Sequence, residues 1–188
     1  MARALMLIDV QRNMLEPPTP VPSAAAIRDA LQDLLLRARQ AGALVIHVQN
    51  DGPPGDPDEP GTDGWQLAFP AGPGDLIVRK DQQDTFAANP ALAGELAAQE
   101  ITGVIIAGMQ SNYCVAESSR GARKQGLQAI LSTHILFLLE TTESAAFGSA
   151  VDTAAADLAT RAATRSRRVS TQWLTPASPA AALGEPAA

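Results

Sequence analysis

Three residues with the chemistry of a nucleophilic site, Asp9, Lys80 and Cys114, each come just after an apolar run of the sequence. A carboxylate can accept the proton of a thiol, and an ammonium group can stabilise both anions and hold their geometry. Together the three could activate the thiol for attack on a carbonyl carbon. Each also has a plainer interpretation, because a lone cysteine is commonly a small buried hydrophobic residue, a lysine a surface group and an aspartate a turn residue.

Cys114 is the only cysteine of the chain, and its position predicts a reactive thiol. It lies just beyond Gly108, which ends the apolar run 104–107, and the segment that follows it can be helical up to Gly126. A thiol at the beginning of a helix lies near unpaired N–H groups and the positive end of the helix dipole. Both favour the thiolate, so we expect a pKa below the usual ~8.5 and fast labelling by iodoacetamide near neutral pH.

An α/β fold would bring these residues together. Continuous apolar runs predict buried parallel strands, because a strand covered on both faces need not alternate with polar residues. These runs lie at 4–8, 43–48, 76–78, 104–107 and 128–132, and an edge strand is expected at 167–171. The carboxyl ends of parallel strands converge on the ligand crevice of an open sheet, which places Asp9, Lys80 and Cys114 at one edge.

Helical segments separate the strands. The first has apolar residues at helical spacing from 27 to 38 and stops at Gly42, and the others are expected at 89–99, after Cys114 up to Gly126, and at 142–163. Ser23 would cap the first helix, and Asn89 would cap the second with Pro90 in its first turn. Strands that alternate with helices predict a three-layer αβα sandwich around a doubly wound, mostly parallel sheet of five to six strands.

Length, charge and composition narrow the function. The 188 residues suit a single domain at 1–175, followed by a Pro/Ala-rich C-terminal tail at 176–188. A net charge of −6 gives no electrostatic basis for binding nucleic acid. No stretch approaches the ~18 apolar residues of a membrane span, and a single cysteine excludes an internal disulfide. We therefore expect a cytoplasmic protein that acts on a small molecule, without nucleic-acid or membrane partners.

Residues 50–74 form the most unusual stretch, because proline and glycine recur throughout it with aspartates between them. A loop of this length within a compact domain is usually functional or disordered. Trp65 could anchor the loop by packing, or it could form part of a substrate wall. The spacing of the aspartates is not that of a calcium-binding EF-hand loop.

Four motifs in order make the chain resemble the isochorismatase-like cysteine hydrolase superfamily. Asp9-Val-Gln11 with Met14 is similar to the opening D-x-Q-x-x-F, with methionine at the aromatic position. Lys80 with Phe86 is similar to the block K-x-x-x-S-A-F, although aspartate and threonine replace its serine and alanine. The resemblance extends from about residue 5 to residue 126.

The other two motifs lie in the 50–74 loop and around the cysteine. Residues 60–67, Pro-Gly-Thr-Asp-Gly-Trp-Gln-Leu, resemble a loop that is frequent in one branch of the superfamily. Residues 108–122 resemble the signature G-x-x-T-x-x-C-V-x-x-T-x-x-x-A, with serine at both threonine positions. Four motifs in the right order, each on the expected element, make the resemblance specific.

The resemblance implies a catalytic triad made of Asp9, Lys80 and Cys114. Asp9 would act as the general base and later give its proton to the leaving amine. Lys80 would stabilise the charged pair, and Cys114 would form a thioester with the substrate. The resemblance also implies a cis peptide bond between Met109 and Gln110, which would aim the N–H of Gln110, with that of Cys114, at the developing oxyanion.

The resemblance also bears on the pocket and on metal ions. The candidates for the substrate pocket are Gln11, Met14, Trp65, Phe86, Tyr113 and His134. No cofactor and no metal ion are expected, because the metal-dependent branch carries an Asp-x-His pair and a further histidine near residues 50–74. The two histidines of this chain, His47 and His134, lie outside that stretch.

The chain departs from the superfamily after Ser132, where residues 133–139 are strongly apolar. This segment could line the pocket or form an oligomer contact, and we expect a homo-oligomer, a dimer or a tetramer. The sequence predicts a metal-independent hydrolase that cleaves a C–N bond of a small amide or ureide. Two other functions stay open: vinyl-ether hydrolysis of an isochorismate-like substrate, which needs the aspartate but no cysteine, and a non-catalytic binding module that retains the fold.

Overall fold

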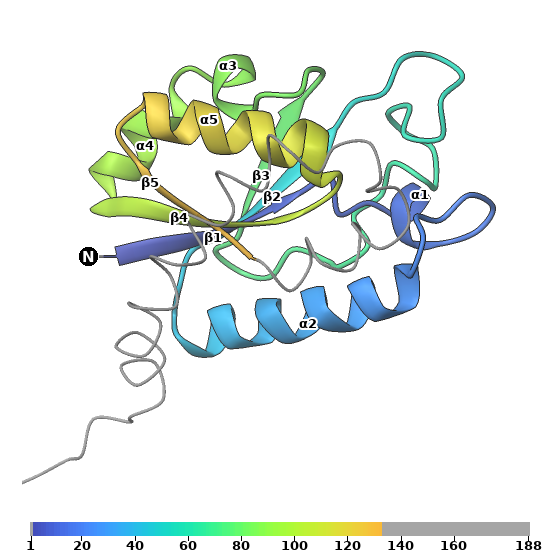
Figure 1. Cartoon of the computed structure of the whole chain (residues 1–188), viewed down its shortest axis with the longest axis horizontal. Coiled ribbons are helices and arrows are strands. Elements are labelled where there is room, and N and C mark those ends of the chain that lie inside the picture. Colours follow the sequence, from blue (N-terminus) through green and yellow to red (C-terminus); the bar gives the residue numbers. More distant parts are fainter. Residues whose placement is uncertain (1, 133–188) are drawn as a thin grey trace, which may run out of the picture. The chain divides into compact units, whose positions relative to one another are not determined.

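The computed structural model describes residues 2–132, which form a parallel sheet with helices on both faces (Figure 1). The strands are β1 (Ala2–Ile8), β2 (Val45–Asn50), β3 (Leu76–Lys80), β4 (Ile101–Gly108) and β5 (Gln128–Leu131). The helices are α1 (Arg12–Leu15), α2 (Ala24–Gln40), α3 (Thr85–Ala88), α4 (Leu92–Ala98) and α5 (Ala116–Lys124). A kinked turn, η1 (Ser111–Val115), comes directly before α5.

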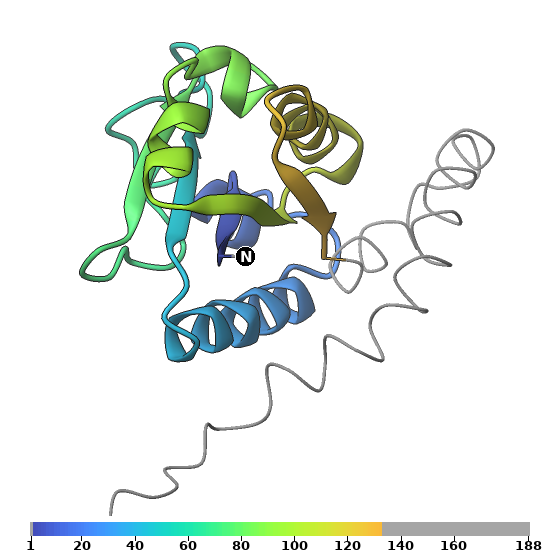
Figure 2. The ribbon, with the colours of Figure 1, turned by 90° about the vertical axis from the view of Figure 1, so that its left-hand side faces the viewer.

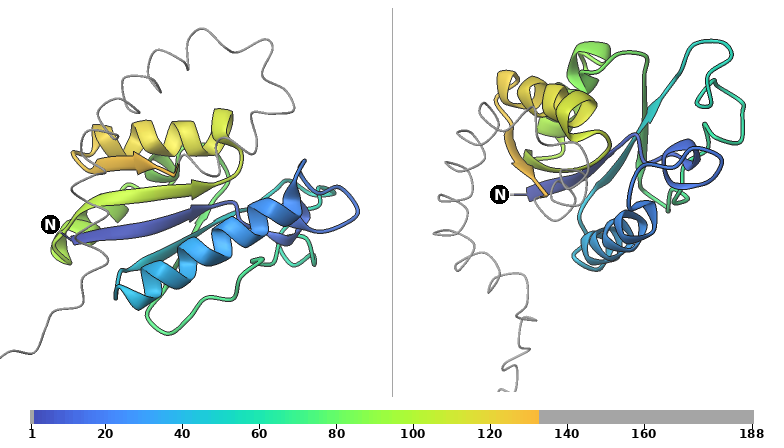
Figure 3. Two further views of the ribbon diagram at one scale, coloured as in Figure 1. Left: turned by 60° about the horizontal axis from the view of Figure 1, so that its bottom comes forward. Right: turned by 45° about the vertical axis from the view of Figure 1, so that its right-hand side comes forward.

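The strands are ordered β3-β2-β1-β4-β5, and every neighbouring pair is parallel. The chain moves outward from β1 to β3 and then crosses to β4 on the other side of β1. α2 covers one face of the sheet, and α4 and α5 cover the other (Figures 2 and 3). The predicted three-layer, doubly wound fold is confirmed. Because the strand order reverses beside β1, a ligand crevice is expected outside the carboxyl ends of β1 and β4.

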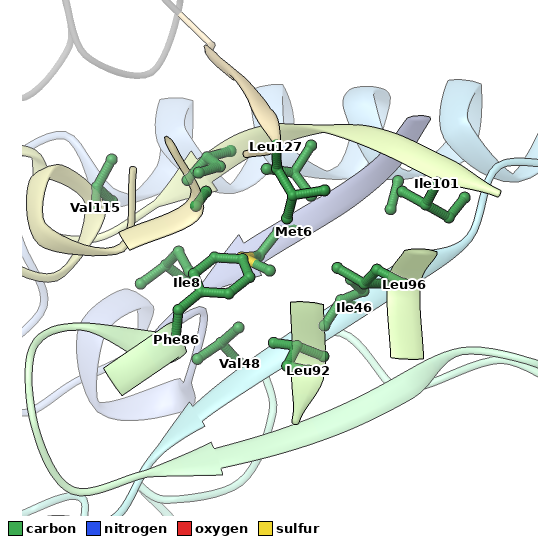
Figure 4. Close-up of a cluster of buried hydrophobic side chains, with 14 residues drawn as sticks. Met6, Ile8, Ile46, Val48, Phe86, Leu92, Leu96, Ile101, Val115 and Leu127 are labelled. Carbon is green, nitrogen blue, oxygen red and sulfur yellow. The ribbon is translucent and has the colours of Figure 1, made fainter. Parts of the chain in front are cut away.

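The central strand β1 packs against helices on both of its faces, which explains its continuous apolar run. Successive side chains of a strand point to opposite faces, so Met6 and Ile8 lie on one side and Leu5 and Leu7 on the other. The first pair packs with Ile46, Val48, Phe86, Leu92, Leu96 and Leu127 (Figure 4). The second pair packs with Ile27, Leu31 and Leu35 of α2. The core therefore holds the carboxyl end of β1, and Asp9 after it, in a fixed place.

Two predicted helix caps are wrong. Ser23 adopts a left-handed backbone with φ of 58° and its side chain makes no capping hydrogen bond, although it directly precedes α2. α4 begins only at Leu92, because Asn89 ends the short helix α3 instead of starting α4. The side chain of Asn89 donates to the carbonyl groups of Arg79 and Thr85 and so ties β3 to α3.

Several predictions concern residues 133–188, which lie outside the part of the chain that the structure describes. They are the helix at 142–163, the edge strand at 167–171, the apolar segment 133–139, His134 and the tail from residue 176. Between residues 2 and 132, no helix combines the length and the apolar character that a membrane crossing needs.

Candidate active site

The sheet brings Asp9, Lys80 and Cys114 together at the carboxyl ends of the strands. Asp9 follows β1, Lys80 is the last residue of β3, and Cys114 lies in η1 beyond β4. The Lys80 Nζ atom donates to Asp9 Oδ2 at 3.0 Å and to Cys114 Sγ at 3.4 Å. One ammonium group thus joins the carboxylate to the thiol. In Figure 1 this edge is the end of the sheet at which α1 lies.

The lysine and the aspartate form a buried ion pair. The Lys80 side chain is 0% exposed and that of Asp9 is 4% exposed, whereas Cys114 is half-buried. Asp9 has a φ of 51°, in the left-handed region that few residues other than glycine adopt. A buried ion pair needs further hydrogen bonds to be stable. Because Asp9 and Lys80 are both buried, the Cys114 thiol is the member of the three that a substrate can reach.

Asp9 has the properties of a proton acceptor. Its Oδ1 atom is buried and has no hydrogen-bond partner among the described residues. Burial raises the pKa of Asp9 above its usual value, and the nearby Lys80 ammonium only partly opposes this effect. A carboxylate with a raised pKa and one free oxygen can take a proton from a neighbouring thiol more readily than an exposed aspartate can.

The predicted low pKa of Cys114 is wrong. Burial raises the pKa of the thiol to about 11, the nearby Asp9 carboxylate acts in the same direction, and Lys80 opposes both. Cys114 also lies in η1, before the first residue of α5, with a kink at Tyr113 just ahead of it. The sequence shows that a helix follows the cysteine, but it does not show that the folded chain removes water from the thiol and places a carboxylate beside it.

This environment predicts slow alkylation of the native protein. With a pKa of about 11 rather than 9.0, the thiolate fraction of Cys114 near neutral pH falls about a hundredfold. We expect the native chain to react with iodoacetamide about a hundredfold more slowly than the same chain unfolded in denaturant. Mass spectrometry can follow the reaction without interference, since the chain has no other cysteine. Equal rates in the native and unfolded states would contradict the raised pKa.

The turn between β4 and Cys114 has an unusual backbone. The peptide bond between Met109 and Gln110 is cis. Gly108 has a φ of 130°, and a side chain at this position would collide with the backbone of Ile8. Glycine is therefore required at position 108, where β4 passes close to β1 and turns toward the thiol. The turn continues with Gln110, whose carbonyl oxygen accepts from the N–H of Tyr113 at 3.1 Å and from that of Val115 at 3.3 Å.

A second set of contacts holds the segment after Lys80 against the helix after Cys114. The Ser118 hydroxyl oxygen accepts from the N–H of Thr85 at 3.1 Å and lies 2.8 Å from the Thr85 Oγ1 atom. It also donates to the carbonyl oxygen of Gln83 at 3.2 Å. A side chain at Gly121 would collide with the carboxylate of Asp84, so α5 approaches this segment closely. These contacts fix the separation of β3 from η1, and with it that of the ammonium from the thiol.

The predicted pocket residues lie in different places. Phe86 is 2% exposed and packs in the core against β1 and β2 (Figure 4), and Met14 is half-buried against the core residues that α2 covers. Tyr113 is exposed, one residue before the thiol. Trp65 donates from Nε1 to Asp51 and lies under the Arg79 guanidinium at 5.1 Å, so it anchors the loop after β2. Gln11 is buried and binds backbone groups of this same loop.

The loop between β2 and β3 is held by its own carboxylates. Asp51 pairs with Arg79, and Asp63 pairs with Arg12. At the end of the loop, Asp75 accepts from Arg39 and lies 3.1 Å from the buried His47 ring, whose pKa is lowered by burial. These acids organise the loop, and between residues 2 and 132 no group of three or more histidine, cysteine, aspartate or glutamate side chains is placed to hold a metal ion.

Asn50 is a residue of the site that sequence reasoning missed. Its Oδ1 atom accepts from Lys80 Nζ at 2.9 Å. The signal for it was present, because Asn50 ends β2 in the same way that Lys80 ends β3, and polar residues at these strand ends meet in the crevice. The predicted strand at 43–48 ended two residues too early, which left Asn50 in the loop.

Two surface cavities lie away from these residues. One of about 410 Å³ is lined by residues of β3, α3 and α4, and another of about 310 Å³ lies between α1 and the loop at 57–64. Asp9, Lys80 and Cys114 line neither of them. The chemistry of the side chains, rather than the size of a cavity, therefore identifies the candidate site.

Comparisons with known proteins match most of the described part of the chain to one domain family. The sequence profile of the Isochorismatase domain matches residues 3–134. The chain is 42% identical to a protein of Streptomyces noursei named streptothricin hydrolase. The match extends over 131 residues, which are 69% of this chain and 47% of the relative. The chain spans about half the length of the curated relatives it matches.

Solved structures match about seven tenths of the chain. N-carbamoylsarcosine amidase from Thermoplasma acidophilum has a TM-score of 0.66 at 20% identity, over 72% of this chain and 84% of that one. A cysteine hydrolase from Pseudomonas syringae has a TM-score of 0.63 at 24% identity, over 71% of each chain. At these identities the likeness concerns the fold.

Proposed function

The chain belongs to the isochorismatase family, and from this premise we propose that it is a cysteine hydrolase that cleaves the C–N bond of a small amide or ureide. The observation that carries the proposal is the contact of the Lys80 ammonium with both the Asp9 carboxylate and the Cys114 thiol. Carboxylate, ammonium and thiol are the groups that general-base activation of a nucleophile requires.

The first half of the reaction forms a thioester. Asp9 Oδ1, which is buried and unpaired, takes the proton of the Cys114 thiol, and the thiolate attacks the carbonyl carbon of the substrate. The N–H groups of Gln110 and Cys114 stabilise the oxyanion that develops on the carbonyl oxygen. When the C–N bond breaks, Asp9 returns its proton to the leaving nitrogen, and the amine or ammonia departs.

The second half hydrolyses the thioester. Asp9, again a carboxylate, takes a proton from a water molecule, and the resulting hydroxide attacks the thioester carbonyl carbon. The C–S bond breaks, the Cys114 thiolate leaves and recovers its proton from Asp9, and the acid product departs. Lys80 remains an ammonium group throughout and holds the other two in place.

The high pKa of the thiol suits this mechanism. Transfer of a proton from Cys114 to Asp9 leaves the total charge of the three groups unchanged, since one anion replaces another beside the same ammonium. Release of that proton to water would instead leave two anions beside one cation in a buried place, which burial and the carboxylate both oppose. The proton therefore stays in the site, where the leaving nitrogen needs it.

Vinyl-ether hydrolysis is the second candidate function, because the family takes its name from that reaction. It would use Asp9 as the acid and leave the thiol without a role. The contact between Lys80 and Cys114 favours amide cleavage over this alternative, and so does the hydrolase activity for which the Streptomyces noursei relative is named. A binding module without catalysis would need neither the buried ion pair nor the thiol.

A panel of substrates tests the proposal. The full chain should release ammonia or a free amine from at least one member of a set of primary amides, ureides, cyclic amides and streptothricin, and should leave a vinyl ether such as isochorismate intact. Stopped with acid during turnover, the enzyme should carry an acyl group on Cys114 that mass spectrometry detects. Release of pyruvate from isochorismate without an acyl-enzyme would favour the second function.

A chelator provides the matching control. We expect the same turnover after treatment with EDTA as before it, since the three proposed groups act without a metal ion. The residues at 50–74 also offer carboxylates but no histidine, the usual ligand of catalytic zinc. Loss of turnover on chelation, with recovery on addition of Zn²⁺, Fe²⁺ or Mn²⁺, would contradict the proposal.

A further inference from the structure

We propose that Asn50 positions the Lys80 ammonium, and that Asp58 in the loop after β2 sets the orientation of the Asn50 amide. The loop thereby controls the reactivity of Cys114. This inference rests on the proposed function for its meaning in catalysis, but its geometry concerns only the described residues. Neither Asn50 nor Asp58 belongs to the motifs by which the chain resembles its family.

The Lys80 ammonium has three N–H donors, and three acceptors surround it within residues 2–132. The acceptors are Asn50 Oδ1 at 2.9 Å, Asp9 Oδ2 at 3.0 Å and Cys114 Sγ at 3.4 Å. Because the Lys80 side chain is 0% exposed, water does not replace a lost acceptor easily. Asn50 is the member of the three that cannot ionise. It directs the ammonium toward the other two without adding a charge.

Asp58 decides which end of the Asn50 amide meets the lysine. A carboxylate only accepts hydrogen bonds, so Asp58 Oδ2 receives the Asn50 Nδ2–H group at 2.8 Å. The carbonyl end of the same amide must then point the other way, toward Lys80. With the amide reversed, two donors would face each other in a buried place, which is costly.

Further hydrogen bonds fix the positions of Asn50 and Asp58. The Gln11 side chain accepts from the N–H of Asn50 at 2.8 Å and donates to its carbonyl oxygen at 3.0 Å, so the backbone of Asn50 cannot shift along β2. Gly52 donates its N–H to the carbonyl oxygen of Asp58 at 2.9 Å, and a side chain at Gly52 would collide with the Asp58 carboxylate. The loop thus places one carboxylate oxygen against one amide.

Loss of this chain of contacts should weaken the stabilisation of the Cys114 thiolate by Lys80. In Asn50→Ala the ammonium loses an acceptor and is less firmly directed at the sulfur. We expect the pKa of Cys114 to rise further, so that iodoacetamide alkylates the thiol about tenfold more slowly at a given pH, which corresponds to about one pKa unit. On a substrate, kcat should fall by a similar factor while KM changes little, because Asn50 acts through Lys80.

Two variants of Asp58 form a matched pair. Asp58→Asn and Asp58→Ala both remove the carboxylate charge, which contributes to the raised pKa of Asp9, so that effect cancels between them. Only the asparagine variant keeps an oxygen that can accept from Asn50 Nδ2. We expect Asp58→Ala to slow alkylation of Cys114 severalfold relative to Asp58→Asn. Both changes lie in the loop rather than in the core, so this pair remains informative if Asn50→Ala folds poorly.

The experiment measures alkylation of the full chain by iodoacetamide from neutral to alkaline pH for wild type, Asn50→Ala, the Asp58 pair and Asn89→Ala. Asn89 is the control, because it also ties β3 to a neighbouring element but does not contact Lys80. A rate profile displaced to higher pH in Asn50→Ala and Asp58→Ala, but not in Asp58→Asn or Asn89→Ala, supports the proposal.

Several results would overturn it. They are an unchanged profile in Asn50→Ala, equal profiles in the two Asp58 variants, or an Asn89→Ala profile displaced as far as that of Asn50→Ala. A rise in KM with unchanged alkylation would instead make Asn50 a substrate contact. Because alkylation needs no substrate, these outcomes do not depend on the test of amide hydrolysis, and either proposal can fail alone.

Discussion

Replacing Cys114 with alanine is expected to lower kcat/KM for amide hydrolysis by at least about 10⁴-fold, the largest effect of any single change in this chain. The thiol is the only nucleophile of the three groups that can form the proposed thioester, and no second cysteine can replace it. The change removes a half-buried side chain and leaves the Asp9–Lys80 pair in place. The fold should therefore be retained, with a melting temperature close to that of the wild type.

Cys114→Ser is the matched control for this experiment. A hydroxyl oxygen can still accept from Lys80 but is a far weaker nucleophile under the same base, so we expect serine to be nearly as inactive as alanine. Steady-state kinetics on a substrate from the panel would measure both variants. Full turnover by Cys114→Ala would exclude the thioester mechanism and would favour vinyl-ether hydrolysis, in which the cysteine has no part.

The second large effect is expected at Asp9 and Lys80. Asp9→Asn keeps the shape of the side chain but cannot accept a proton, so kcat should fall by about 10²–10⁴-fold. Lys80→Met keeps the apolar stem but removes the charge that stabilises the carboxylate and the thiolate, and a comparable loss is expected. Since the groups act as one unit, the double variant should be little worse than the worse single variant.

The same variants should also change how the free energy of unfolding depends on pH. In Lys80→Met the Asp9 carboxylate would be buried without its partner, which costs about 3–5 kcal/mol of unfolding free energy when it is ionised. The pKa of Asp9 is already raised by burial in the wild type. Because this pKa is raised in the folded state, the contribution of Asp9 to stability is greatest below the unfolded value of 3.8 and is lost as the pH rises through the folded value.

Denaturant unfolding at several pH values can measure this pH dependence of the free energy of unfolding. Lys80→Met should lose more stability between acidic and neutral pH than the wild type does, and the double variant with Asp9→Asn should lose little, because it buries no charge at this position. Rate losses that multiply cleanly in the double variant, together with a pH-independent stability of Lys80→Met, would show that the two residues do not form a working pair.

The positions of the strands were predictable because a strand that is buried on both faces appears in the sequence as a continuous apolar run. The runs at 4–8 and 104–107 became β1 and β4, two neighbouring interior strands, and each was confirmed within a few residues. The caps were less predictable. Ser23 and Asn89 are both good capping residues by type, but Asn89 binds the backbone of β3 and α3 instead, a choice that only tertiary contacts impose.

Some residues of the candidate site were likewise predictable from the sequence, and others were not. The rule that strand ends of a parallel sheet converge was enough to gather Asp9, Lys80 and Cys114, since it depends only on where apolar runs stop. The same rule would have found Asn50, had the second strand been extended by two residues. The role of Gln11 could not be anticipated, because its partners Asn50 and Trp65 are 39 and 54 residues away in the chain.

By itself, the sequence determined the α/β class of the fold, the order of its strands along the chain and the three reactive groups at one edge, because these follow from local hydrophobic pattern and from residue type. Tertiary structure decided the electrostatics. The pKa of Cys114 is raised where the sequence predicted a lowered one, because desolvation and the proximity of Asp9 outweigh Lys80. Desolvation and the facing of one side chain toward another are properties of the packed chain, and they set whether a thiol proton leaves to water or passes to the carboxylate beside it.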